Sequence, residues 1–386
     1  MLLNLEERLL IRDEKEFHMV EEKCFEPYEG EPDKERLLAA YRREPVDRVP
    51  NIEVLIEDKH VEKILGKYAG NTIAYGGDPA KGVVDQKYIR PMYPNDFIDL
   101  CNIIGQDIMI FEGGTWTPFK KEDINGELTL VVDRSIKTRK DFETLTLDSK
   151  TVIDYDVKYI REYKETLKKR NSKIGVAVLY GCIMQTLYEW IVGMNDFMVM
   201  CYEDRGLVED MMEVSTEHFI ELTKTIVKEG VDFVFPADDV AFKTGLFLPP
   251  KLFKEIWIPR MARVMEPAVN ANIPILFHSD GKIDDIMDDL IEMGVSCITP
   301  LDPYSIDYRE YKKRYGSMVC LQGNIDLEFP LSKGTPFDVD KDVKEHMDVL
   351  KPGYGYVSSS SHSIVNYMPY ENFVTYINAV HKYGKY

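Results

Sequence analysis

The sequence predicts a single (β/α)8 TIM barrel over residues 46–386, preceded by a helical N-terminal extension over residues 1–45. Short apolar runs typical of strands recur eight times, helical patterns separate them, and no linker or internal repeat divides the 386 residues. Strands that alternate with helices pair in parallel, because each return to the same strand direction needs a crossover. An open doubly wound sheet has the same alternation, and periodicity does not reveal whether the last strand pairs with the first.

The elements follow in order along the chain. The charged N-terminal extension has a helical pattern that ends at the prolines of REPVDRVP. The eight expected strands are VPNIEVL, QDIMIFEGG, KIGVAVLYG, VDFVFPADD, IPILFHSDG, VSCITPLDP, MVCLQGNID and YGYVSSSSH. Between two of them, residues 282–294 carry apolar side chains at helical spacing, and Gly294 closes that helix. Residues 112–156 form the largest irregular insertion, which we expect to cover the barrel mouth.

Composition narrows the class of protein. A formal net charge of −19 disfavours general binding to nucleic acid or to anionic membranes, both of which need clustered Lys and Arg. No segment approaches the roughly 20 apolar residues that span a bilayer, and the acidic N-terminus does not resemble a secretory signal. The six cysteines fall singly, with no CxxC pair. We therefore expect a soluble, cytoplasmic protein with reduced thiols.

Polar residues just past the strand ends of a barrel converge on one mouth, which carries the chemistry. In chain order they are Glu53, Glu112, Tyr180, Asp238, Asp239, His278, Asp280, Asp302, Gln322, Asn324, Asp326 and His362. The set is acidic and contains two of the seven histidines of the chain. Taken alone, His278 could equally be a histidine that is hydrogen-bonded to loop backbone.

Histidines and aspartates from different strand ends suit zinc, which accepts imidazole nitrogen and carboxylate oxygen and keeps one position open in catalytic sites. We predict Asp239, His278 and His362 as ligands, with Asp280 as a further ligand or as a carboxylate that orients an imidazole. Adjacent strand residues point to opposite sides, so only one of Asp238 and Asp239 is expected at the metal. In a metal-free alternative, the carboxylates act as general acids or bind a cationic substrate.

Other signals are fewer. Trp116 in GGTWTPF follows a strand end and indicates an apolar pocket for an aromatic ligand, whereas helical core packing better explains Trp190 and Trp257. The chain has no P-loop, no GxGxxG fingerprint, no HExxH and no GxSxG. Cys182 follows a strand, and burial in the core is the better interpretation of it.

Several longer blocks carry a family resemblance. REPVDRVP, PADDVAFKTGLFLPPKLFKEIWIPR, ILFHSDG, CLQGNIDLEFPLSKGTP and SSSHSIVNYMPYENF together resemble the uroporphyrinogen decarboxylase superfamily, from about residue 36 onward. The resemblance implies the β/α barrel. The decarboxylases carry a basic MRQAGR-like segment near the first strand, where this chain has VPNIEVLIEDKHVEK. Without those arginines, a polyanionic tetrapyrrole cannot be held in the same way, so a decarboxylase-like lyase is the less favoured alternative.

The other branch of the superfamily contains cobalamin-dependent methyltransferases. Members that methylate a small thiol such as coenzyme M hold zinc with a His-x-Cys motif and a late cysteine. His278 matches the motif's histidine, Asp280 stands where its cysteine would be, and His362 occupies the late position. Nitrogen and oxygen ligands leave a metal better able to polarise oxygen than thiolates do. The thiol methyltransferase is therefore a second alternative.

The resemblance implies the substrate-activating component of an anaerobic methyl-transfer system, of the kind used in methanogenesis or acetogenesis. It would move a methyl group from an aromatic methyl ether to the Co(I) corrinoid of a partner protein, since this chain has no DxHxxG corrinoid motif. We assign catalysis to His278, Asp239 and Tyr180, and substrate binding to Trp116, Gln322, Asn324 and Glu53. A homodimer is compatible with this assignment, and barrels also host unrelated hydrolases, lyases and binding proteins.

Overall fold

A computed structural model describes residues 24–73, 90–114, 119–124, 127–132, 136–145 and 147–386. Its centre is a parallel sheet of seven strands, in which every strand lies beside its neighbours in sequence. In spatial order the strands are β1 (Ile108–Gly113), β4 (Gly175–Gly181), β5 (Phe233–Ala237), β8 (Leu276–His278), β9 (Cys297–Thr299), β10 (Cys320–Gln322) and β11 (Tyr356–Val357). A doubly wound sheet reverses its strand order, so this alternative is excluded.

The first expected strand, over residues 49–55, is extended but is not part of the ladder. One parallel bridge joins Asn51 to Ser358 beyond β11, where Ile52 N donates to Ser358 O (3.0 Å) and Ser358 N donates to Pro50 O (2.9 Å). On the side of β1, the contact is made by a side chain, since Glu53 N donates to Gln106 Oε1 (2.8 Å). The fold is thus TIM-barrel-like, with seven of the eight expected strands formed.

Apolar side chains fill the interior of the curled sheet. Each strand sends alternate residues inward, and these residues form one buried cluster with Ile52. Its members from the strands are Ile108, Ile110, Ala177, Phe233, Phe235, Leu276, Cys297, Cys320 and Val357. Helix α1 (Lys34–Tyr41) of the N-terminal extension packs its buried face against this cluster. All eight extended segments therefore share one inner core, as in a barrel.

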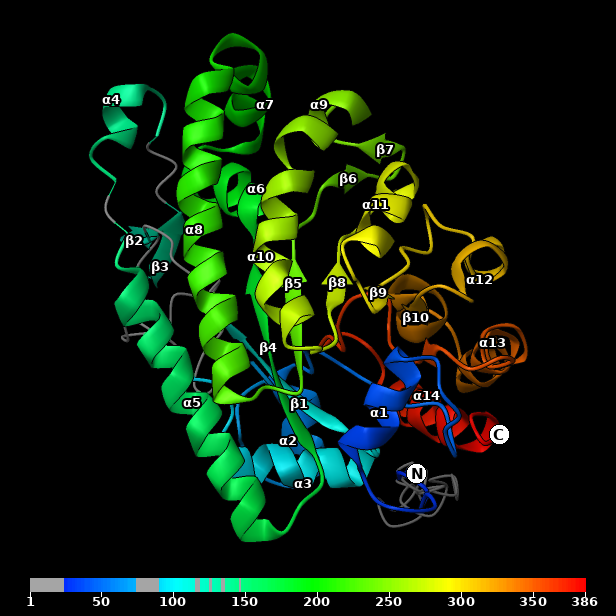
Figure 1. Ribbon diagram of the computed structural model, residues 1–386. Coiled ribbons are helices and arrows are strands. Elements are labelled where there is room, and N and C mark those ends of the chain that lie inside the picture. Colours follow the sequence, from blue (N-terminus) through cyan, green and yellow to red (C-terminus); the bar gives the residue numbers. More distant parts are fainter. Residues whose placement is uncertain (1–23, 74–89, 115–118, 125–126, 133–135, 146) are drawn as a thin grey trace, which may run out of the picture.

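Helices cover the outside of the sheet (Figure 1). The longer ones are α2 (Asp58–Leu65), α3 (Pro94–Ile104), α5 (Ser149–Arg170), α7 (Met194–Glu203), α8 (Arg205–Glu229), α10 (Ile258–Asn270), α12 (Tyr308–Tyr315), α13 (Pro336–Leu350) and α14 (Tyr370–Tyr383). The helix expected over residues 282–294 forms in two parts, a 3-10 turn η3 (Asp284–Ile286) and α11 (Met287–Glu292). Gly294 follows with a φ of 94°, a conformation that favours glycine.

Shorter elements decorate the ends of the strands. The described part of the 112–156 insertion contains the hairpin β2 (Phe119–Ile124) and β3 (Glu127–Val132), and helix α4 (Arg139–Phe142). After β4 come α6 (Ile183–Gln185) and the π-helix η2 (Thr186–Ile191). After β5 come β6 (Ala241–Phe242), β7 (Gly245–Leu246) and α9 (Pro250–Ile256). A second π-helix, η4 (Leu327–Ser332), follows β10.

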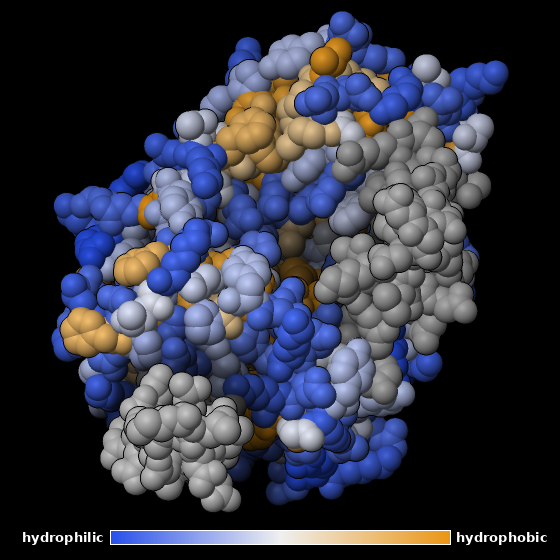
Figure 2. Space-filling view, turned by 180° about the vertical axis from the view of Figure 1, so that it is seen from behind, coloured by the Kyte–Doolittle hydropathy of each residue, from blue (hydrophilic) through white to orange (hydrophobic). Residues whose placement is uncertain are grey.

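One face of the surface can be described by its hydropathy. Figure 2 shows a face that is mostly hydrophilic, with hydrophobic residues gathered near its upper end, the end at which α7 and α9 lie. Among the helices that the structure describes, none is both long enough and apolar enough to cross a membrane.

Candidate functional site

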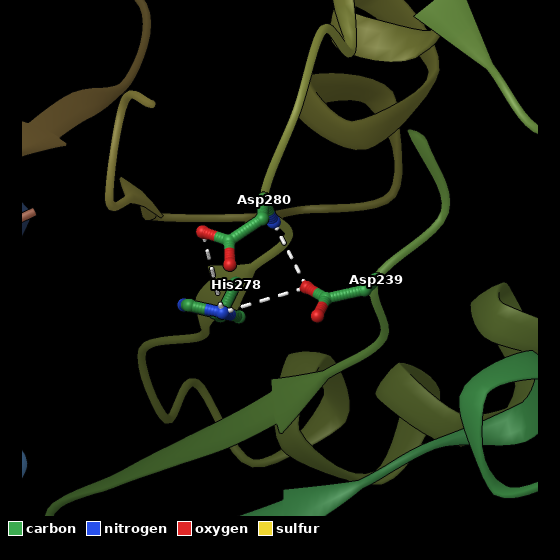
Figure 3. Close-up of side chains that lie close together, drawn as sticks. All are labelled: Asp239, His278 and Asp280. Carbon is green, nitrogen blue, oxygen red and sulfur yellow. Dashed lines mark hydrogen bonds and ion pairs between the residues drawn. The ribbon is translucent and has the colours of Figure 1, made fainter. Parts of the chain in front are cut away.

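Three side chains with metal-binding atoms meet at the carboxyl ends of β5 and β8. Figure 3 shows Asp239, His278 and Asp280 pointing toward one another. His278 Nε2 lies 3.5 Å from Asp239 Oδ1 and 4.0 Å from Asp280 Oδ1. One ligand atom from each of the three residues lies within 4.8 Å of the other two, and all three side chains are half-buried. We call these three residues the Asp-His-Asp triad.

The strand pairing explains why the triad forms. β5 and β8 are neighbours, and Ala237 is the register partner of His278, so the residues that follow Ala237 lie beside the residues that follow His278. Asp280 N donates to Asp239 Oδ1 (2.9 Å), which fixes the two loops together. Loops at the carboxyl ends of neighbouring parallel strands are the usual location of active sites in such folds. The sequence pattern placed these three residues at one mouth, and the structure brings them together.

Asp238 turns the other way, as strand alternation requires. Its carboxylate is fully buried and accepts hydrogen bonds from Met184 N, Gln185 N and the indole of Trp257, the last at 2.7 Å. Burial raises the pKa of Asp238 to about 7, and the three donors counter that rise. This aspartate therefore ties the β5 loop to α6 and to the start of α10, and Trp257 is a core residue as expected.

Asp239 is held in place by residues that the sequence analysis did not identify. Gln185 Nε2 donates to Asp239 Oδ2 (3.3 Å), and Gln185 Oε1 accepts from Asp239 N (3.2 Å). Tyr188 of η2 donates its hydroxyl to Asp239 O (2.8 Å). Gln185 also contacts Glu189. The only sequence signal for Gln185 was its place shortly after a strand end, in YGCIMQ.

The charge pattern of the triad suits a cation. Burial raises the pKa of Asp280, the carboxylates of Asp239 and Asp302 raise it further, and His278 and His362 act in the opposite direction. One imidazole nitrogen and two carboxylate oxygens are also a ligand set that zinc accepts, with a position left for a substrate. The donor set therefore fits the metal that the sequence predicted.

His362, the fourth predicted ligand, does not belong to the triad. Its side chain is exposed and lines, together with Asp280, a cavity of about 380 Å³. We call this space the mouth cavity. Its lining residues are Ala241, Phe242, Lys243, Asp280, Gly281, Asp302, Pro303, Tyr304, Asp326, Leu327, Glu328, Ser361 and His362. His362 is close enough to Asp280 to lower the pKa of that carboxyl.

Several residues predicted for catalysis or substrate binding lie apart from the triad. Tyr180 is fully buried in the layer between sheet and helices, where its ring stacks on Phe219 and its hydroxyl contacts Thr223 Oγ1 at 2.9 Å. Gln322 is buried and accepts from the Tyr41 hydroxyl (3.3 Å). Trp116 lies outside the described residues.

Asn324 and Glu53 also form hydrogen bonds within the protein. Asn324 donates to Leu301 O (2.6 Å) and contacts His346 Nε2 (2.9 Å). Glu53 accepts two hydrogen bonds from Ser360, from its backbone nitrogen (2.8 Å) and its hydroxyl (2.6 Å). Burial raises the pKa of Glu53 to about 7, against the effect of these bonds. Glu53 thus ties the first extended segment to the loop that carries His362.

Known proteins resemble this chain in sequence and in fold. The model of a family described as uroporphyrinogen decarboxylase (URO-D) matches residues 123–383. The methylcobamide:CoM methyltransferase MtaA of Methanosarcina barkeri is 26% identical over 174 residues, which are 44% of this chain and 50% of that protein. A uroporphyrinogen decarboxylase of Actinobacillus pleuropneumoniae is 24% identical over 191 residues, which are 48% of this chain and 51% of that protein. The chain thus spans about half the length of both relatives.

A solved structure shares the architecture. The methyltransferase from Methanosarcina mazei superposes with a TM-score of 0.63, at 17% sequence identity, over 90% of this chain and 97% of that one. At this level of identity the likeness concerns the fold alone, and it agrees with the TIM-barrel-like sheet described above.

Proposed function

Because the chain belongs to the uroporphyrinogen decarboxylase (URO-D) family, we propose that it is a corrinoid-dependent methyltransferase that takes a methyl group from an aromatic methyl ether. The acceptor is the Co(I) corrinoid of a partner protein. The observation that carries this proposal is the Asp-His-Asp triad, a sulfur-free set of metal-ligand atoms at the mouth of the fold. MtaA, whose name describes methylcobamide chemistry, is among the relatives of the chain.

Methyl transfer from an aromatic ether requires stabilisation of the ether oxygen as it leaves. When the bond between methyl carbon and oxygen breaks, its electron pair stays on the oxygen, and the electron pair of Co(I) forms the new bond to the methyl carbon. The phenolate left behind is a poor leaving group unless a proton or a metal ion stabilises it. Zinc held by the triad would supply that Lewis acidity.

The residues of the chain have distinct roles in this proposal. His278, Asp239 and Asp280 would hold the metal. His362, which shares the mouth cavity with Asp280, is proposed as the fourth ligand, in the position that the donor's ether oxygen takes when it binds. Gln185 positions Asp239 through its two hydrogen bonds. The mouth cavity takes the aromatic part of the donor, and the partner protein docks over it.

A decarboxylase activity is disfavoured by charge. Four carboxylates line the mouth cavity, but only one lysine does. A further acidic residue, Glu53, is buried against Ser360 in the loop that carries His362. A polyanionic porphyrinogen would meet repulsion here, because like charges in a partly desolvated cleft interact strongly. This lining supports a donor with little negative charge.

A thiol methyltransferase is a second candidate, favoured by the similarity to MtaA. Such an enzyme activates a thiol, for which thiolate ligands on zinc are suited. In this chain Cys101, Cys182, Cys201, Cys297 and Cys320 are buried, and none contributes to the triad. The sulfur-free ligand set therefore supports oxygen activation over thiol activation.

The test is an anaerobic assay of the zinc-reconstituted protein with a Co(I) corrinoid protein and a panel of methoxylated aromatics, with coenzyme M and methylcobalamin in a parallel reaction. We expect conversion of the Co(I) spectrum to that of methyl-Co(III) with at least one aromatic donor. The variant His278→Ala should lose this activity, whereas Asp285→Asn, an exposed aspartate on η3, should retain it. Equal activity of His278→Ala and the unmodified protein would remove His278 from the site, and thiol methylation alone would favour the second candidate.

A further inference from the structure

The mouth cavity has a definite chemical character. It lies beside the triad and adds Asp302, Asp326 and Glu328 to Asp280, with the aromatic rings of Tyr304 and Phe242 in the same lining. Both rings are largely exposed, at 55% for Tyr304 and 51% for Phe242. An aromatic and acidic lining is unsuited to a carboxylated ligand and suited to a cation.

An ammonium group already occupies a position in this lining. Lys243, in the turn between β6 and β7, places its Nζ 4.2 Å from the centroid of the Tyr304 ring. That distance is within the range of a cation–π contact. The side chain of Lys243 is exposed and belongs to a two-residue turn. It is therefore an ammonium that could move aside, and its position marks where another ammonium could bind.

The carboxylates around this position are fixed by their own loops. Asp302 accepts hydrogen bonds from Tyr304 N (2.8 Å) and from Ser305 Oγ (3.1 Å), and Asp326 accepts from Glu328 N (2.8 Å). The Tyr304 hydroxyl lies 3.5 Å from Asp326 Oδ1. Glu328 has an ion-pair partner in Lys333, whereas Asp302 and Asp326 line the cavity without a lysine partner among the residues that the structure describes.

We propose that the mouth cavity recognises a methyl donor that carries an ammonium group, which replaces the ammonium of Lys243 over Tyr304 and is held by Asp302 and Asp326. This inference rests on the proposed function and narrows its substrate class to amine-bearing aromatic methyl ethers. The methoxy group then points to the triad, which adjoins the cavity through Asp280. Tyr304 and Asp326 determine the specificity for the ammonium group of the donor, and the triad does not bind that group.

The test uses three donors of nearly equal shape and different charge: 4-methoxybenzylamine, 4-methoxybenzyl alcohol and 4-methoxybenzoate. Their binding to the zinc-reconstituted protein is measured by calorimetry, without any corrinoid protein. We expect the amine to bind roughly three- to tenfold more tightly than the alcohol, and the benzoate to bind more weakly than the alcohol. Tighter binding of the benzoate, equal binding of all three, or binding of none overturns the proposal.

Variants separate the contributions. Tyr304→Leu should weaken binding of the amine by roughly two- to fivefold and leave the alcohol nearly unchanged. Asp326→Asn, which keeps a side chain able to accept from Glu328 N, should act in the same direction. Lys243→Ala should strengthen binding of the amine, whereas Lys251→Ala, an exposed lysine on α9, should not. A loss of amine binding in Lys243→Ala would contradict the displacement.

Methyl transfer, assayed separately with the same donors, distinguishes the two claims. Transfer from the alcohol or the benzoate with no preference for the amine in binding would end this inference and leave the proposed function intact. A clear preference for the amine in binding, without methyl transfer from any donor, would support this inference and contradict the proposed function.

Discussion

At the scale of residues, Asp238 and Asp239 show that two neighbours at one strand end can have a structural role and a role in the site, respectively. The two carboxylates are adjacent in sequence, yet Asp238 is fully buried against Trp257 while Asp239 faces His278. Strand alternation predicted that only one of them would reach the site. It did not predict Gln185, because this residue lies where the short helix α6 passes into the π-helix η2, and such a turn has no simple sequence signature.

Gln185→Ala should weaken metal binding without unfolding the protein. Both polar ends of Gln185 hold Asp239, and the loss of such an orienting contact costs about 10–100-fold in metal affinity. Titration of zinc against a chromophoric chelator measures this. Asn195→Ala, an exposed amide on α7, is the matched control. An unchanged zinc affinity in Gln185→Ala would show that Asp239 does not need this support.

At the scale of elements, the strand ends were located from the sequence but the direction of each side chain was not. Tyr180 lies one residue before the end of β4, and its neighbours on the same face, Val176 and Val178, also pack outward under the helices. Gln322 faces inward and reaches Tyr41 of α1. A shift of one residue exchanges the inward and outward faces of a strand. A strand that is buried on both faces is apolar throughout, so its sequence does not show which residues point inward.

Helix α1 is fastened to the end of the sheet by buried charge. Arg36 Nη1 lies 2.6 Å from Asp107 Oδ1, and Arg48 Nη2 lies 3.7 Å from the same atom. Burial raises the pKa of Asp107 to about 6, while both arginines lower it. Arg36→Ala would leave Asp107 poorly compensated, at a cost of roughly 3–5 kcal/mol in the free energy of unfolding. Urea denaturation measures this, with Arg42→Ala, from an exposed pair, expected to cost under about 1 kcal/mol.

Glu53 should make the stability depend on pH. Its folded-state pKa is raised from 4.5 to about 7, so its protonated form is favoured by folding. Its contribution is therefore present below pH 4.5 and is lost as the pH rises through 7. Relative to Glu53→Gln, the unmodified protein should lose roughly 3 kcal/mol in the free energy of unfolding between pH 5 and pH 8. Parallel curves for the two proteins would contradict this.

At the scale of the whole molecule, the alternation of strands and helices predicted the sheet order correctly. Closure of the barrel could not be read from it, because pairing of the first and last strands leaves no trace in periodicity. The 49–55 segment is joined by one bridge only, to Ser358 just beyond β11. The prediction of a metal site at the mouth followed from residue types at strand ends. Which of those residues meet depended on strand register, and this excluded His362 from the triad.

The most direct test of the account is zinc K-edge X-ray absorption spectroscopy on the zinc-reconstituted protein. We expect one zinc ion per chain with nitrogen and oxygen ligands at about 2.0–2.2 Å, and loss of the bound zinc in His278→Ala and Asp239→Asn. A zinc–sulfur distance of about 2.3 Å in the spectrum, or no stoichiometric zinc after reconstitution, would contradict the assignment of the Asp-His-Asp triad as the metal centre.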